Sequence, residues 1–246
     1  MSHVCPKEKT FILQSNALVT LLLLLLSFLL GIGGPEGGAG LPNPEELGPA
    51  AGENLRWDPG SLKGKVIVVD PGHGGDNPGT RGVGPQPEKD NVLAVGWDLK
   101  SMLEYAGAKV IMTRDGDYSP GGPNADQLEA RVRIANVSAA DAYVSIHNDW
   151  NDNAYLTGST TYFFSPDGHR LGASLQRGIT KELKSKDLGV RWANYYVLRN
   201  TAMPAALVEL GFLSNTQEAR LLSTRSYQTK AATGIYHGLV EYFSNL

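Results

Sequence analysis

KVIVVDPGHGG, residues 65–75, is the stretch that decides how the rest of the chain is interpreted. Its first half is a run of Val and Ile, and such β-branched runs are typical of a buried strand. Pro71 and Gly72 end the run, and a glycine-rich turn follows that carries one imidazole, His73. The segment therefore predicts a buried strand with an ionisable side chain directly beyond its carboxyl end.

Strand and helix patterns alternate along the chain after this segment. Further strands are predicted over residues 108–114, 142–147, 159–164, 195–199 and 205–210. Helices are predicted over residues 91–106, 125–139, 170–183 and 227–243. In the second of these helices Leu128, Val132 and Ala135 are expected to face inward. Strands that alternate with helices of these lengths predict an α/β fold, a three-layer sandwich in which helices flank a mostly parallel central sheet.

The first 60 residues do not follow this pattern. Residues 17–32, ALVTLLLLLLSFLLGI, are an uncharged apolar run preceded by Lys7 and Lys9, which is typical of a signal peptide or a transmembrane anchor. Both interpretations remain open, and we favour the uncleaved anchor. Residues 33–60 are rich in Gly, Pro and Glu without an apolar period, and they are predicted to be a linker. We expect a targeting segment (1–32), a linker (33–60) and one folded domain (61–246), placed outside the cytoplasm and membrane-anchored or secreted.

Composition excludes several classes of protein. The chain has one cysteine, Cys5, which precedes the apolar run, so the predicted domain has no thiol for a disulfide framework, a zinc ribbon or a cysteine nucleophile. Residues 59–246 carry equal numbers of acidic and basic side chains, and nucleic-acid-binding domains are usually basic. We therefore expect no nucleic-acid partner, and a metal would have to be bound by His and carboxylate side chains.

Ionisable side chains stand at the ends of three of the predicted strands. His73 follows the first strand, His147 ends the third, and Glu209 lies at the end of the last. Ligands bind open α/β sheets in the crevice beyond the carboxyl ends of the strands, so these side chains are expected to meet there. Glu88 opens the long helix after the first strand, where the intervening loop would bring it beside His73. Two imidazoles and a carboxylate suit Zn²⁺, and a second carboxylate would handle a proton.

Each of these residues also has a purely structural interpretation. A single His at a strand end is more often a hydrogen-bonded structural residue than a ligand, and a Glu in a first helical turn commonly interacts with the helix dipole. Glu209 is harder to explain in this way, because an acid within AALVEL (residues 205–210) is costly to bury without a partner. Asp70 is expected to cap the turn after its strand. The residues alone indicate a metal-hydrolase site and leave its substrate open.

Five motifs resemble, in order and spacing, the zinc-dependent N-acetylmuramoyl-L-alanine amidases of the type 3 family. They are VIVVDPGHGG (66–75), EKDNVLAVGWDLKSMLEYAGAKVIMTR (88–114), RVRIAN (131–136), VSIH (144–147) and PAALVELGFLSN (204–215). The resemblance covers nearly all of residues 65–243. It implies that His73, Glu88 and His147 bind zinc and that Glu209 is catalytic.

The activity implied by this resemblance is zinc-dependent hydrolysis of the amide bond between N-acetylmuramic acid and L-alanine in peptidoglycan, in cell-wall remodelling or lysis. Two alternatives remain: a related zinc peptidase that cuts within the peptide stem, and a non-catalytic wall-binding protein. The presence of all four site residues argues against the second alternative, and the resemblance favours the amidase over the first.

Three residues near the implied site need separate comment. Asn77 stands where the family usually has Asp, and Asp149 stands where the family commonly has Asn. Neither replaces a ligand, and both are expected to change the hydrogen bonds that orient the two histidines. Arg131 matches an arginine of the family and is expected to be structural, with pairing to a carboxylate near the site as the alternative.

Overall fold

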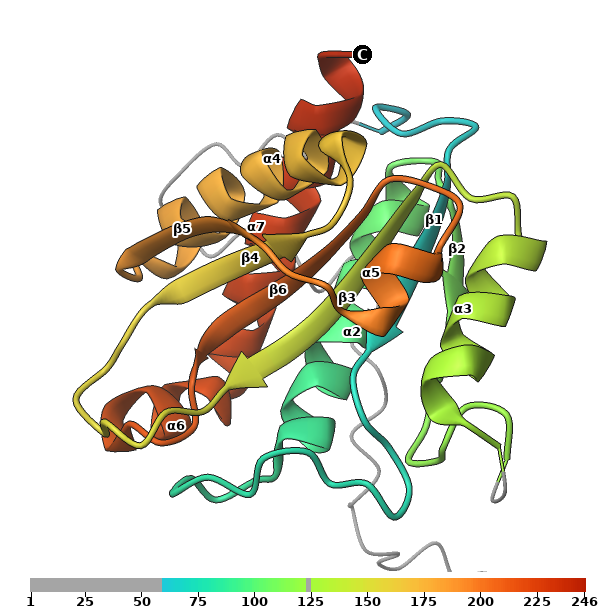
Figure 1. Ribbon diagram of the computed structural model, residues 1–246. Coiled ribbons are helices and arrows are strands. Elements are labelled where there is room, and N and C mark those ends of the chain that lie inside the picture. Colours follow the sequence, from blue (N-terminus) through green and yellow to red (C-terminus); the bar gives the residue numbers. More distant parts are fainter. Residues whose placement is uncertain (1–58, 123–124) are drawn as a thin grey trace, which may run out of the picture. The chain divides into compact units, whose positions relative to one another are not determined.

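The computed structural model describes residues 59–122 and 125–246 (Figure 1). The predicted targeting segment and almost all of the predicted linker lie outside the described residues, so these assignments stay predictions. In the described part of the chain, no helix combines the length and the apolar character needed to cross a bilayer.

A six-stranded sheet forms the centre of the domain, with the spatial order β2-β1-β3-β6-β4-β5. The strands are β1 (Val66–Pro71), β2 (Lys109–Met112), β3 (Ala142–Asp149), β4 (Ser159–Phe163), β5 (Asp187–Trp192) and β6 (Ala205–Phe212). Strands β4 and β6 are antiparallel, and every other pair of neighbours is parallel. The predicted α/β fold with a mostly parallel sheet is confirmed.

Helices cover both faces of this sheet (Figure 1). The helices α2 (Glu88–Tyr105), α4 (Pro166–Leu183) and α7 (Arg225–Ser244) pack on one face, which we call the core face. The helices α3 (Gln127–Val137) and α5 (Tyr196–Asn200) pack on the other, which we call the site face. A short helix, α6 (Thr216–Leu222), follows β6.

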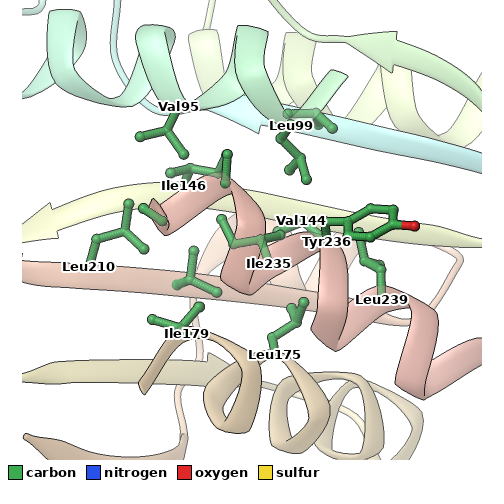
Figure 2. Packing of buried hydrophobic residues seen from close by; sticks show 14 of the residues in the cluster. Val95, Leu99, Val144, Ile146, Leu175, Ile179, Leu210, Ile235, Tyr236 and Leu239 are labelled. Carbon is green, nitrogen blue, oxygen red and sulfur yellow. The ribbon is translucent and has the colours of Figure 1, made fainter. Parts of the chain in front are cut away.

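The main hydrophobic core lies on the core face. Val144 and Ile146 of β3 and Val208 and Leu210 of β6 are fully buried there. Figure 2 shows members of this cluster, which includes Val95, Leu99, Leu175, Ile179, Ile235 and Leu239 from the covering helices. Side chains alternate along a strand, so the residues adjacent to these belong to the site face. They include Ser145, His147 and Glu209. Packing of one face therefore orients the polar residues of the other.

Four details differ from the sequence predictions, and one of them is the short, half-exposed helix α6, which was not predicted. Residues 195–199 are not a strand: Tyr195 is extended and helix α5 begins after it. Strand β5 was not predicted, because it is a half-exposed edge strand that contains Gly189 and has no apolar run. Leu128 was expected inside the core, but it is 46% exposed in the first turn of α3. Each error falls where partial exposure weakens the apolar pattern that the prediction relies on.

Candidate active site

The loop after β1 carries His73 in a left-handed backbone conformation, with φ at 61°. Two arginines hold this loop through its carbonyl groups: Arg114 Nη2 donates to the oxygen of Gly72 at 2.7 Å, and Arg131 Nη2 donates to the oxygen of His73. A Cβ at Gly72 would lie 2.2 Å from Cε1 of His147, so only glycine allows the loop to pass this close to that ring. The loop is thereby fixed with the two imidazoles side by side.

Three of the four predicted site residues meet at one point. Oε1 of Glu88 lies 3.0 Å from Nε2 of His73 and 2.8 Å from Nδ1 of His147. One ligand atom from each residue can be chosen so that all three lie within 4.8 Å of one another. The register of the parallel pair β1 and β3 accounts for this, because it places Pro71, the last residue of β1, opposite Ile146, the residue before His147. The convergence expected at the carboxyl ends of the strands is therefore observed.

Glu88 is buried, and its carboxylate is held on both oxygens. Oε2 accepts the backbone N–H of Thr80 at 2.9 Å, and Oε1 accepts that of Asn148 at 3.1 Å. Burial by itself raises the pKa of Glu88, but the neighbouring imidazoles of His147 and His73 outweigh it and hold this pKa well below its usual range. Glu88 is therefore an anionic carboxylate between two imidazoles, and it could act as a metal ligand.

Asn77 fixes the orientation of one imidazole. Its Oδ1 accepts the backbone N–H of Gly79 at 3.0 Å and lies 3.1 Å from Nδ1 of His73. Since this oxygen can only accept, Nδ1 of His73 carries the proton and Nε2 is left with a free lone pair. Asp149, the other departure from the family pattern, accepts the backbone N–H of Trp150 at 2.7 Å, while Nδ1 of His147 bonds to Glu88.

Glu209 lies beside this cluster on the neighbouring strand. The register of β3 and β6 pairs Glu209 with His147. Its Oε2 is buried and has no hydrogen-bond partner among the described residues. Burial, followed by the negative charges of Glu88 and Asp149, raises the pKa of Glu209 well above its usual value. A carboxyl group with a free oxygen and a perturbed pKa is a strong candidate for proton transfer.

Asp70 is the centre of a buried polar network beneath the site. Its carboxylate accepts hydrogen bonds from Thr113 at 2.5 Å, from Ser145 at 2.7 Å, and from Tyr143 and Arg131. Burial raises the pKa of Asp70, yet Arg131 and the three hydroxyl groups together hold it well below its usual range. The structure corrects the prediction that Asp70 caps a turn. Arg131 is buried and structural as expected, and it is also paired with a carboxylate next to the site.

A pocket of about 290 Å³ opens over the site face and contains His73, His147 and Glu209 in its lining. Helix α3 contributes Gln127, Leu128 and Arg131 to its wall, and the start of α5 contributes Tyr195, Tyr196 and Val197. The sequence pattern does not indicate these wall residues as part of the site, apart from Arg131. The one signal in the sequence is the adjacent pair Tyr195 and Tyr196, at the start of α5, which the pattern places in a predicted strand.

The donor set fits a borderline-soft divalent cation, because imidazole and carboxylate are both common ligands of Zn²⁺. An α/β sandwich with a His-Glu-His cluster and a further buried acid at the carboxyl edge of its sheet is typical of metal-dependent hydrolases.

Within that class, residues 67–241 match the N-acetylmuramoyl-L-alanine amidase family, and the chain belongs to this family. The resemblance noted from the five motifs is thereby confirmed, as is the assignment of the chain as an enzyme of peptidoglycan.

Relatives from several bacteria support this assignment. The chain is 36% identical over 204 residues to the germination-specific N-acetylmuramoyl-L-alanine amidase of Bacillus subtilis, covering 78% of this chain and 86% of that protein. The structure of the CwlD amidase from Clostridioides difficile, solved in complex with the GerS lipoprotein, is 32% identical with a TM-score of 0.70, covering 74% and 100%. The amidase AmiC2 of Nostoc punctiforme is 34% identical with a TM-score of 0.68, covering 73% and 97%.

Proposed function

We propose that the protein hydrolyses the amide bond between N-acetylmuramic acid and L-alanine, with Zn²⁺ held by His73, Glu88 and His147 and with Glu209 as the catalytic acid and base. The observation that carries this proposal is the meeting of the three donor atoms beside a buried carboxyl oxygen that has no partner among the described residues. The four residues lie in or directly against one pocket, on the face of the sheet opposite the core.

The residues of the chain would hold the ion through Nε2 of His73, Nδ1 of His147 and the carboxylate of Glu88. When bound, Zn²⁺ supplies Lewis-acid polarisation of the amide carbonyl and a lowered pKa for water. Asn77 keeps the proton of His73 on Nδ1 and so keeps Nε2 available as a ligand.

Glu209 would move the proton during the reaction. Its carboxylate accepts a proton from the water that attacks the lactyl carbonyl carbon, and it then donates this proton to the departing nitrogen of L-alanine. A C–O bond forms and the C–N bond breaks, leaving a lactyl carboxylate on the sugar and a free amino group on the stem peptide. Residues of α3 and α5 line the same pocket as Glu209.

We also propose where the enzyme acts. Residues 1–32 would export the chain and, if uncleaved, anchor it in the membrane, and residues 33–60 would link the anchor to the domain of residues 61–246. A relative described as a probable cell wall amidase supports an extracytoplasmic location. Full-length protein that fractionates with membranes and resists salt extraction would support the anchor. A mature amino terminus within residues 33–58 would show cleavage instead.

End-group analysis tests the proposed reaction. Full-length, zinc-loaded protein is incubated with purified peptidoglycan, and new amino and carboxyl ends are identified by mass spectrometry. We expect new L-alanine amino termini and free lactyl carboxylates on muramic acid. New ends within the stem would instead identify a stem peptidase. The Glu209→Gln variant is the matched control, and equal release by this variant and the wild type would contradict the proposed role of Glu209.

A further inference from the structure

A pair of charged side chains holds the glycine-rich turn that carries His73. Gly75 is the centre of this contact, because both of its backbone polar groups are engaged. Its N–H donates to Oδ1 of Asp117 at 2.8 Å, and its carbonyl oxygen accepts from Nζ of Lys89 at 2.9 Å. The ammonium group of Lys89 also donates to both carboxylate oxygens of Asp117, at 2.9 and 2.7 Å. Gly75, Lys89 and Asp117 therefore form a closed ring of hydrogen bonds, which we call the Gly75 clamp.

The Gly75 clamp connects three segments that are distant in sequence. Lys89 is the second residue of α2 and directly follows Glu88. Asp117 lies in the segment after β2, and Gly75 lies two residues after His73. The clamp thus reaches from the helix start that carries one proposed metal ligand to the turn that carries another.

The backbone of this turn explains why it needs a restraint. His73, Gly74 and Gly75 all have positive φ, at 61°, 122° and 60°. Glycine loses more conformational freedom on ordering than any other residue, so a turn of this composition is costly to hold in one conformation. Two backbone hydrogen bonds between Gly74 and Asn77 close the turn, and Asn77 is the residue that orients the ring of His73. Gly75 lies inside the closed turn, so a contact that fixes it also constrains its neighbours.

The Gly75 clamp is poorly placed to stabilise the fold as a whole. The side chain of Asp117 is 52% exposed, and exposed ion pairs contribute little to the free energy of unfolding. The hydrogen bond from Lys89, followed by that from Gly75, lowers the pKa of Asp117, so its carboxylate is ionised at neutral pH. A pair that adds little stability, yet holds the turn of a proposed ligand, is suited to positioning that ligand.

Arg114 supports the same connection from within the protein. Its Nη2 donates to the carbonyl oxygens of Gly72 and Lys89, both at 2.7 Å. These two oxygens belong to the residue before His73 and to the residue after Glu88. The buried guanidinium group therefore fixes the backbones that flank the two ligands, and the Gly75 clamp fixes the tip of the turn between them.

We propose that Lys89 and Asp117 are positioning residues for metal binding: by holding Gly75, they set His73 facing Glu88 before the ion arrives. This inference rests on the proposed function, because it takes His73 and Glu88 as metal ligands. A turn that is already ordered does not have to be ordered by the ion, so the metal binds more tightly.

The zinc affinity of the full-length protein, measured by competition with a chelator, tests the inference. Lys89→Met and Asp117→Ala should each weaken zinc binding by about tenfold, the lower end of the effect of residues that orient metal ligands. The double variant should lose less than the product of the two effects, because both side chains act on Gly75. Lys89→Arg should keep part of the affinity that Lys89→Met loses, since a guanidinium group also donates to both partners.

Lys100→Met is the matched control. It breaks an ion pair with Glu104, 2.6 Å between Nζ and Oε1, about three turns farther along the same helix. This variant removes the same charge from α2 as Lys89→Met does, and it should bind zinc as the wild type does. An equal loss of affinity in the two variants would trace the effect to the charge of the helix and would overturn the inference.

The urea midpoint of the metal-free proteins separates positioning from stability. It should stay close to the wild-type value in Lys89→Met and Asp117→Ala. A loss of zinc affinity that follows a lowered midpoint would assign the pair to stability and would contradict the inference. Wild-type zinc affinity in both variants would contradict it as well.

His73→Ala distinguishes failure of the inference from failure of the proposed function. If this variant binds zinc as tightly as the wild type, the ligand assignment of the proposed function fails, and the inference fails with it. If it loses zinc while Lys89→Met and Asp117→Ala keep wild-type affinity, the ligand assignment stands and only the positioning role fails.

Discussion

The two faces of the central sheet use the same strands for different purposes. On the core face, Ile146 and Val208 are fully buried among apolar side chains of α2, α4 and α7. On the site face, their immediate neighbours His147 and Glu209 belong to a polar site that only two shorter helices cover. Because side chains alternate along a strand, a residue that stabilises the core is followed directly by a residue of the site. A substitution on one face should lower stability, and a substitution one position away should lower activity.

Adjacent residues of β3 give the largest contrast between the two faces. His147→Ala removes a proposed ligand and should abolish both zinc retention and amide hydrolysis, while the melting temperature of the metal-free protein changes little. Ile146→Ala should lower the free energy of unfolding by about 2–5 kcal/mol, because it leaves a cavity in the core, and the folded fraction should keep its zinc. Zinc content and thermal unfolding measured on both variants test the contrast. A His147→Ala protein with wild-type zinc content would show that the ligands are misassigned.

Replacing either of the two site glutamates by glutamine should have a different effect on zinc binding and turnover. Glu209→Gln should keep its zinc and lose turnover by about 10²–10⁴-fold, the usual scale for a positioned acid or base. It should not lower stability, because the carboxyl group it replaces is buried with one oxygen unpartnered among the described residues. Glu88→Gln should weaken zinc binding, since it removes an anionic ligand. Zinc content and muropeptide cleavage are measured on both, and an active, zinc-loaded Glu209→Gln enzyme would remove that residue from the mechanism.

The sequence allowed the central part of the fold to be predicted because the buried strands are continuous apolar runs. It failed at β5 and α5, where half-exposed residues such as Val190 and Tyr195 carry no clear period. Local preference is weakest there, and packing against β4 and α3 decides the conformation.

The four proposed site residues could be found from sequence because the apolar runs of the predicted strands stop near them or, for Glu88, a helix begins there; the strands β3 and β6 in fact continue to Asp149 and Phe212. The network beneath them could not be found in this way. Thr113, Tyr143 and Ser145 are ordinary strand residues in sequence, and only the register of β1, β2 and β3 shows that their hydroxyl groups converge on Asp70.

Asp70 is an exception to the contrast between the two faces, because it lies on the site face and yet is expected to stabilise the fold. Its folded pKa is depressed, so its contribution to stability is complete above its unfolded pKa of about 3.9 and is lost as the pH falls below that value toward the folded pKa. Asp70→Asn should lower the free energy of unfolding at pH 7 by about 3 kcal/mol, since it leaves the buried Arg131 unpaired. It should also flatten the decline of stability below about pH 4. Urea unfolding of both proteins across this range tests the prediction, and parallel pH profiles would contradict it.

The smallest effect separates a residue that orients a ligand from one that only lies nearby. Asn77→Ala removes the acceptor that holds the proton of His73 on Nδ1, so it should lower zinc affinity by about tenfold and leave stability close to that of the wild type. Asn77→Asp keeps an acceptor in the same place and should retain the affinity. Asp149→Asn is the comparison on the other histidine strand: its side chain accepts from Trp150 and not from a histidine, so its effect on zinc affinity should be smaller than that of Asn77→Ala. Competition with a chelator measures all three variants. Wild-type affinity in Asn77→Ala would mean that Arg114 and Arg131, which hold the same loop through its carbonyl groups, are sufficient to orient His73.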